Sequence, residues 1–137
     1  MRSECAHLPP HGDGIEDLCE INEYVRAAYQ NAIDKGFWGD PRRAMLINVG
    51  EKIALMHSEL SEAFEEWRAG KKLNEVYYAG DENNPARKPE GFPIEMADCV
   101  IRIFDFCGAA GIDLQTAIQT KMKYNQQRPH RHGGKRA

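Results

Sequence analysis

The chain has 137 residues, of which 42% are hydrophobic, and its 21 acidic and 18 basic residues give a formal net charge of −3. This length allows one hydrophobic core but not two ordinary domains, and the mild acidity argues against a general nucleic-acid-binding protein. No apolar run approaches the roughly 18 residues that span a membrane, and the four cysteines form no CxxC pair. We therefore expect a soluble, cytoplasmic, single-domain protein.

The N-terminal part is predicted to be an arm followed by a helix. Residues 1–14 include MRSECAHLPPHG, which combines two prolines with no periodic pattern, so we expect a flexible arm. From residue 15 to 33 the apolar residues follow helical spacing, and Gly36 is a plausible stop. A helix is therefore predicted over 15–33, at the start of a domain spanning 15–128.

A second, longer helix is predicted after the turn GFWGDP. Asp40 is suited to cap the helix, and Pro41 to occupy its first position. The pattern continues to about residue 69 and stops at Gly70. The apolar positions predict a buried stripe made of Val49, Ile53, Met56, Leu60, Phe64 and Trp67.

Residues 70–93 are rich in Gly, Asn and Pro, and they predict a long loop in which only LNEVYY favours regular structure. A third helix is predicted over 94–109, and Asp113 is suited to cap a fourth helix that ends before Pro129. Residues 129–137 form a basic tail. The pattern as a whole predicts an all-α bundle of about four to five helices.

Two acidic stripes lie on these helices. In EMADCVIRIFDF, the charged residues Glu95, Asp98, Arg102 and Asp105 fall within a narrow sector of an otherwise apolar helix. In HSELSEAFEEWR, Glu59, Glu62 and Glu66 share a stripe beside the apolar face. If the two helices pack antiparallel, Glu59, Glu62, Glu95 and Asp98 can converge.

Four converging carboxylates require positive charge nearby. Two unit charges about 6 Å apart repel by roughly 3 kcal/mol at an effective dielectric constant near 20. Arg102 could neutralise one of them, but Mg²⁺, with Mn²⁺ as an alternative, fits a carboxylate ligand set better. A solvated acidic face and salt bridges between helices are the competing interpretations of the same residues.

The C-terminal part is basic. KMKYNQQRPHRHGGK places Lys121, Asn125 and Arg128 on one face of the last helix, where they could contact phosphate oxygens. Beside an acidic metal site, such a face suits phosphate-ester chemistry. By itself it is more typical of a solubilising basic C-terminus or a weakly RNA-binding tail.

These motifs together resemble the MazG-like all-α nucleoside triphosphate pyrophosphohydrolases. SELSE at 58–62 and EMAD at 95–98 resemble the ExxE and ExxD halves of that superfamily, and KGFWGD and the C-terminal pattern resemble further segments of it. Ser58 stands where many members have an additional Glu. The resemblance implies a dimer or dimer of dimers in which four residues bind Mg²⁺: Glu59, Glu62, Glu95 and Asp98.

The resemblance also implies a nucleoside triphosphate substrate, cleaved to the monophosphate and pyrophosphate, with phosphates contacted by Lys121, Asn125 and Arg128. We expect Glu59 or Glu62 to orient or deprotonate the attacking water. Trp38 could stack on the base or make a core or dimer contact, and His57 could touch substrate or be a packed histidine. Two alternatives stay open: phosphoribosyl-ATP pyrophosphohydrolase activity, or a non-catalytic oligomerisation or RNA-binding module.

Overall fold

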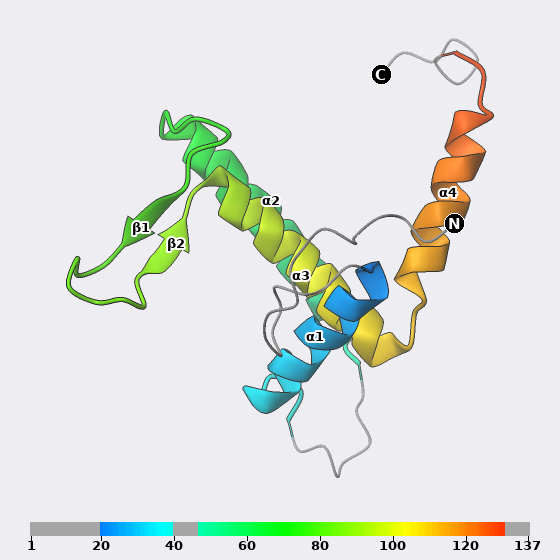
Figure 1. Ribbon diagram of the computed structural model, residues 1–137, viewed down its shortest axis with the longest axis horizontal. Coiled ribbons are helices and arrows are strands. Elements are labelled where there is room, and N and C mark those ends of the chain that lie inside the picture. Colours follow the sequence, from blue (N-terminus) through cyan, green and yellow to red (C-terminus); the bar gives the residue numbers. More distant parts are fainter. Residues whose placement is uncertain (1–19, 40–46, 131–137) are drawn as a thin grey trace, which may run out of the picture.

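The computed structural model describes residues 20–39 and 47–130 of the chain. In chain order these residues form α1 (Ile21–Asp34), α2 (Val49–Arg68), β1 (Tyr77–Ala79), β2 (Lys88–Glu90), α3 (Phe92–Ala110) and α4 (Leu114–Gln126) (Figure 1). This part of the chain is mostly helical, which confirms the predicted all-α class. None of its helices combines the length and the apolar character that a membrane crossing requires.

The predicted start of the second helix is wrong. Residues 47 and 48 are not helical, and α2 begins at Val49 because the Asn48 side chain accepts a hydrogen bond from the Glu51 backbone N–H, 3.1 Å away. The expected cap Asp40 and Pro41 lie outside the described residues, as do the N-terminal arm, residues 15–19 and most of the basic tail.

The predicted start of the first helix, at residue 15, is also wrong: Glu20 is extended and α1 begins at Ile21, where the Glu20 backbone N–H donates to the Glu23 side chain at 3.0 Å. The boundaries of the last two helices follow the sequence signals closely. Asp113 caps α4 by accepting from the Thr116 backbone N–H at 3.1 Å, as predicted. Gly111 ends α3 in the left-handed conformation, with a φ of 67°. The helix predicted over 94–109 is one residue longer at its end and begins two residues earlier, at Phe92, with Pro93 in its first turn.

Helix α3 is the centre of the bundle and packs against both α1 and α2. It runs antiparallel to α2, as Figure 1 shows, so the middle of α2 lies against the first half of α3. The crossing with α1 is close: a Cβ added to Gly108 would lie 2.5 Å from the Cβ of Tyr29, shorter than any real contact. A glycine is therefore required there for the two helices to approach.

The predicted loop over 70–93 contains a β-hairpin that the sequence did not indicate. Strands β1 and β2 pair antiparallel, with Tyr77 opposite Glu90. The Tyr77 hydroxyl contacts both carboxylate oxygens of Glu66 on α2, at 3.0 and 3.2 Å, and this bond fixes the hairpin to the helix. Gly91 joins β2 to α3 with a φ of 118°, where a side chain would also collide with the Glu75 carbonyl oxygen.

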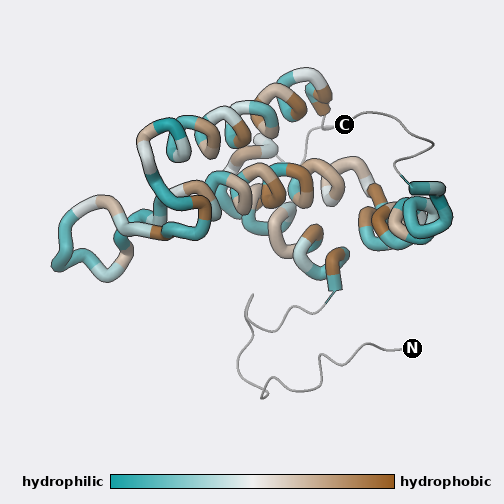
Figure 2. Tube along the Cα trace, turned by 90° about the horizontal axis from the view of Figure 1, so that it is seen from above, coloured by the Kyte–Doolittle hydropathy of each residue, from teal (hydrophilic) through white to brown (hydrophobic). Residues whose placement is uncertain are grey.

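Helix α4 lies at the opposite end of the molecule from the hairpin in both views (Figures 1 and 2). It packs on α1, where the Asn22 side-chain amide donates to Asp113 at 2.8 Å and the Gln115 backbone N–H donates to Asn22 at 3.2 Å. None of the α4 residues is buried.

The core of a single chain is small, and the buried stripe predicted on α2 is wrong. The buried apolar residues of the described part are Val25, Ala32, Ala63, Cys99 and Cys107. Five of the six predicted stripe residues are 42% to 54% exposed: Val49, Ile53, Leu60, Phe64 and Trp67. The reason is that α2 turns the adjacent face, with Glu59 and Ala63, toward α3.

Candidate metal centre

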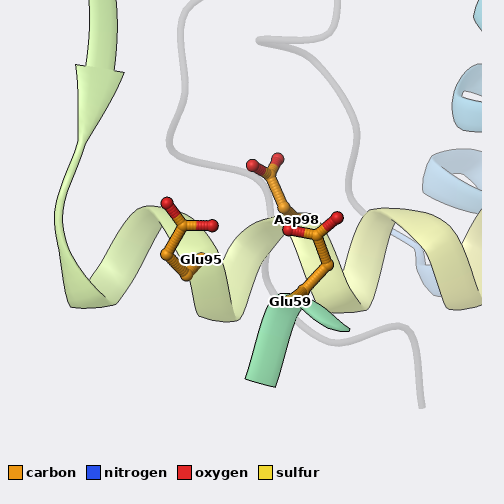
Figure 3. A group of neighbouring side chains, drawn as sticks. All are labelled: Glu59, Glu95 and Asp98. Carbon is orange, nitrogen blue, oxygen red and sulfur yellow. The ribbon is translucent and has the colours of Figure 1, made fainter. Parts of the chain in front are cut away.

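Three carboxylates from two helices converge where α2 crosses α3. Glu59 comes from α2, and Glu95 and Asp98 lie one turn apart on α3 (Figure 3). One oxygen of each group lies within 4.8 Å of an oxygen of each other group. Glu59 and Glu95 are only 6% and 5% exposed, and Asp98 is half-buried. The convergence predicted from the two stripes is thus present for these three residues.

Burial and mutual repulsion raise the pKa of two acids in this cluster, Glu95 and Asp98. The pKa of Glu95 is raised from 4.5 to about 7. Burial is the largest cause, and the negative charges of neighbouring acids add to it: Glu62, Asp98, Glu59 and Glu90. The pKa of Asp98 is also raised, by burial first and then by Glu59, although Arg102 and Lys88 partly oppose this. Within the described part of the chain, no cation lies within ion-pair distance of Glu95 or Asp98.

Among the residues that the structure describes, Glu59 has one cationic partner. The Arg102 Nε, on α3, donates to Glu59 Oε1 at 2.5 Å, so the predicted neutralising role of Arg102 is confirmed for one acid. The bond engages one carboxylate oxygen and leaves the second oxygen available. Arg102 therefore fixes the orientation of Glu59 without closing the cluster.

The donor set fits a hard divalent cation. Three carboxylates offer oxygen ligands of the kind that Mg²⁺ and Mn²⁺ prefer. Arg102 balances only part of their negative charge. No histidine or cysteine belongs to the group, which does not favour zinc. This buried group could therefore hold a metal ion.

The fourth predicted ligand, Glu62, is not part of this group of three. It lies on the exposed side of α2, one turn after Glu59. Its charge nevertheless is the largest electrostatic contribution to the raised pKa of Glu95. Glu62 is thus a neighbour of the cluster in the described conformation.

A cleft of about 410 Å³ opens beside the cluster, between α1, α2 and α3. Two of the clustered acids, Glu59 and Asp98, line it, together with the cations Lys52 and Arg102. Its remaining lining residues are Ala28, Asn31, Ala32, Phe37, Glu51, Leu55, Ile101 and Asp105. A ligand in this cleft would contact acidic, basic and apolar groups at once.

Trp38 is held at the edge of this region rather than free to stack on a ligand. Its indole N–H donates to Asp105 at 2.6 Å, the Lys52 ammonium lies 4.1 Å from its ring centroid, and Tyr29 packs against its edge. Phe37, in contrast, lines the cleft and is 74% exposed.

The other predicted substrate contacts lie apart from the cluster. His57 is exposed on α2. Lys121 and Asn125 are exposed on α4, but Arg128 follows the end of that helix, so the prediction that all three share one helix face is wrong for Arg128. Lys121 and Arg128 lie 5.0 and 5.7 Å from the ring centroid of Tyr124. Because α4 lies beyond α1, the chain does not bring these residues to its own cluster (Figure 1).

Lys52 was missed as a site residue at the sequence level. It stands two turns before Glu59 on α2, so its spacing of seven residues places it on the same helix face. That spacing was a usable signal. Phe37 stands next to Trp38 in the sequence, and nothing in the sequence distinguishes which of the two aromatic rings faces a cleft.

No protein-family model, no curated protein sequence and no solved structure matches this chain.

Proposed function

We propose that this protein hydrolyses a nucleoside triphosphate, or its deoxy form, to the monophosphate and pyrophosphate in a Mg²⁺-dependent reaction. The proposal is carried by the buried cluster of Glu59, Glu95 and Asp98 opening onto a cleft that also contains cations. The resemblance to MazG-like pyrophosphohydrolases supports the same reaction. A phosphate chain needs this combination, because metal and cations together balance its charge.

In this proposal the three clustered acids hold Mg²⁺, with Mn²⁺ as an alternative. The bound ion supplies charge neutralisation to the phosphates and lowers the pKa of water. Arg102 holds Glu59 in its ligand orientation through the Nε bond. The bond formed joins water oxygen to phosphorus, and the bond broken is the anhydride between the α and β phosphorus atoms.

Glu62 is the proposed general base. It is exposed, and it lies close enough to Glu95 to raise the pKa of that residue, whereas Glu59 is engaged by Arg102. A carboxylate in this position accepts the proton of the attacking water. The nucleobase then extends along the cleft, where Phe37 offers an exposed ring for stacking.

The active unit in this proposal is a homodimer or a dimer of dimers. The exposed apolar residues of α2 support it, and so does an apolar groove of about 610 Å³ between α1 and α3 that includes Tyr24, Met96 and Phe104. In such an assembly Lys121 and Asn125 of α4, and Arg128 just after it, reach the phosphates at the cluster of a partner subunit.

The test is pyrophosphate release from each ribo- and deoxyribonucleoside triphosphate, and from phosphoribosyl-ATP, in the presence of Mg²⁺. Asp98→Asn should lower the rate by about 100-fold or more, because it removes a charged ligand. Glu62→Gln should lower the maximal rate while leaving Mn²⁺ binding intact. Glu65→Gln is the matched control, since Glu65 lies on α2 but pairs with Arg68 away from the cluster.

If no substrate yields pyrophosphate, or if Asp98→Asn is as active as the parent chain, the proposed reaction is wrong. A salt-sensitive RNA complex formed by an inactive chain would instead identify a binding module.

A further inference from the structure

Two cations enter the cleft from different helices. Lys52 lies on α2 and Arg102 on α3, and both line the 410 Å³ cleft together with Glu59 and Asp98. The cluster of acids and this pair of cations therefore share one cavity. The phosphate contacts expected on α4 do not, within one chain, reach it.

Lys52 is positioned by an aromatic ring, and its charge also acts on Asp105 in the same cleft. Its ammonium lies 4.1 Å from the centroid of the Trp38 ring, and Trp38 is itself held by its hydrogen bond to Asp105. Among the described residues no carboxylate forms an ion pair with Lys52. The aromatic ring therefore orients a charge that remains available to an anion.

Arg102 is half engaged. Its Nε bonds Glu59, whereas its two terminal guanidinium nitrogens have no hydrogen-bond partner in the described part of the chain. The side chain is 41% exposed and borders the cleft. Terminal guanidinium nitrogens in this state can donate two parallel hydrogen bonds to a phosphoryl group.

Because of the charges that line the cleft, binding of a polyphosphate by Lys52 and Arg102 should depend on a bound metal ion. The cations Lys52 and Arg102 are outnumbered by the acids that line the same cavity: Glu51, Glu59, Asp98 and Asp105. A polyphosphate would thus be repelled by the cleft alone. A divalent cation on the cluster offsets Glu59 and Asp98, so that Lys52 and Arg102 balance the two remaining acids, Glu51 and Asp105, and the net repulsion of a polyphosphate is removed.

We propose that Lys52 and Arg102 form the phosphate-binding subsite of this cleft, and that they bind the phosphoryl oxygens of a polyphosphate chain once a divalent cation occupies the acidic cluster. This inference rests on the proposed function and adds the residues that hold the substrate within a single chain. Lys52 contacts the chain as a point charge, and Arg102 connects it to the metal ligand Glu59.

The experiment is a calorimetric titration with inorganic tripolyphosphate, with and without excess Mg²⁺, which requires no hydrolysis. The parent chain should bind tripolyphosphate with Mg²⁺ and at least about tenfold more weakly without it. Lys52→Met should weaken binding by about tenfold, the loss expected for one charge-assisted contact. Lys52→Arg keeps the charge and should retain most of the affinity.

Two controls separate the subsite from the metal cluster. Lys52→Met should bind Mn²⁺ as the parent does, because Lys52 does not contact the cluster acids, whereas Arg102→Gln should change both Mn²⁺ and tripolyphosphate binding. Arg68→Gln should change neither, since Arg68 pairs with Glu65 at the exposed end of α2.

The inference is overturned if the parent binds no tripolyphosphate, if binding does not depend on Mg²⁺, or if Lys52→Met binds as tightly as the parent. These outcomes are distinct from failure of the proposed reaction. If the parent hydrolyses no nucleotide but Lys52→Met weakens tripolyphosphate binding, the subsite stands and the proposed reaction fails. If the parent is an active enzyme and Lys52→Met does not change tripolyphosphate binding, the subsite is wrong and the reaction stands.

Discussion

The crossing of α2 and α3 carries acidic residues, whereas helix α4, at the edge of the molecule, carries basic ones, and the two regions differ in burial. At the crossing, acids from two helices are buried against each other, and one of them, Glu95, has its pKa raised to about 7. On α4 the basic residues are exposed, and no residue of that helix is buried.

This difference identifies the α2–α3 crossing as the region whose folding carries an unfavourable electrostatic contribution. Burying carboxylates is unfavourable, so the crossing stores a cost that a bound cation would relieve. Exposed lysine and arginine side chains cost little, and they gain their role only when something is brought to them. The first region is assembled within one chain, whereas the basic side chains of the second remain exposed.

The largest stability effect should come from Glu95. The folded chain keeps the Glu95 proton up to about pH 7, whereas an unfolded chain releases it near 4.5. The folded state therefore binds more protons across this window, and stability falls as the pH rises through it, by up to about 3 kcal/mol. Glu95→Gln should remove this loss, so that the variant is more stable than the parent at pH 8 in EDTA.

Urea unfolding at pH 5 and pH 8 measures this difference. The stability gain of Glu95→Gln should be small at pH 5 and large at pH 8, and Mg²⁺ should stabilise the parent but not the variant. A variant that is no more stable than the parent at pH 8 would show that the charge of Glu95 does not destabilise the folded state.

A smaller effect should follow from Gly108→Ala at the crossing of α1 and α3. The added methyl would lie 2.5 Å from Tyr29, so the helices must separate, at a cost of about 1–3 kcal/mol. Gly50→Ala in α2 is the matched control, because its nearest contact is 3.7 Å away and alanine favours the helix by about 0.5–1 kcal/mol. In thermal unfolding, Tm should fall for Gly108→Ala and rise for Gly50→Ala. A change of Tm in the same direction for both variants would contradict the close α1–α3 contact.

The smallest stability effect is expected on α4. Lys121→Gln and Arg128→Gln should each change the free energy of unfolding by less than about 0.5 kcal/mol, because Lys121 is exposed and Arg128, just after the helix, is only partly buried. Pyrophosphate release should nevertheless fall if these residues serve a partner subunit. Unchanged activity in both variants would restrict the phosphate contacts to the cleft.

The acidic cluster could be predicted because it depends on local spacing. Glu95 and Asp98 are three residues apart on one helix, and an antiparallel neighbour brings Glu59 to them. The separation of Glu62 from this group could not be predicted, since a rotation of α2 by one residue, about 100°, decides which side chains face α3. The same rotation exposes the stripe containing Leu60 and Phe64, which had been predicted to be buried.

The hairpin was missed for a different reason. Its strands contain only three residues each, and Pro89 within β2 weakens any strand signal. What fixes it is the contact from Tyr77 to Glu66, which joins residues on different elements and leaves no local pattern. Such long-range contacts are beyond what periodicity alone can predict.

The central claim, that the crossing of α2 and α3 binds a divalent cation, is tested most directly by calorimetric titration of the metal-free chain with Mn²⁺ at pH 8. We expect saturable binding by the parent and by Glu65→Gln, and affinity weaker by about 100-fold in Glu95→Gln, which lacks one ligand charge. The absence of binding by the parent, or equal affinity in Glu95→Gln, would contradict the account.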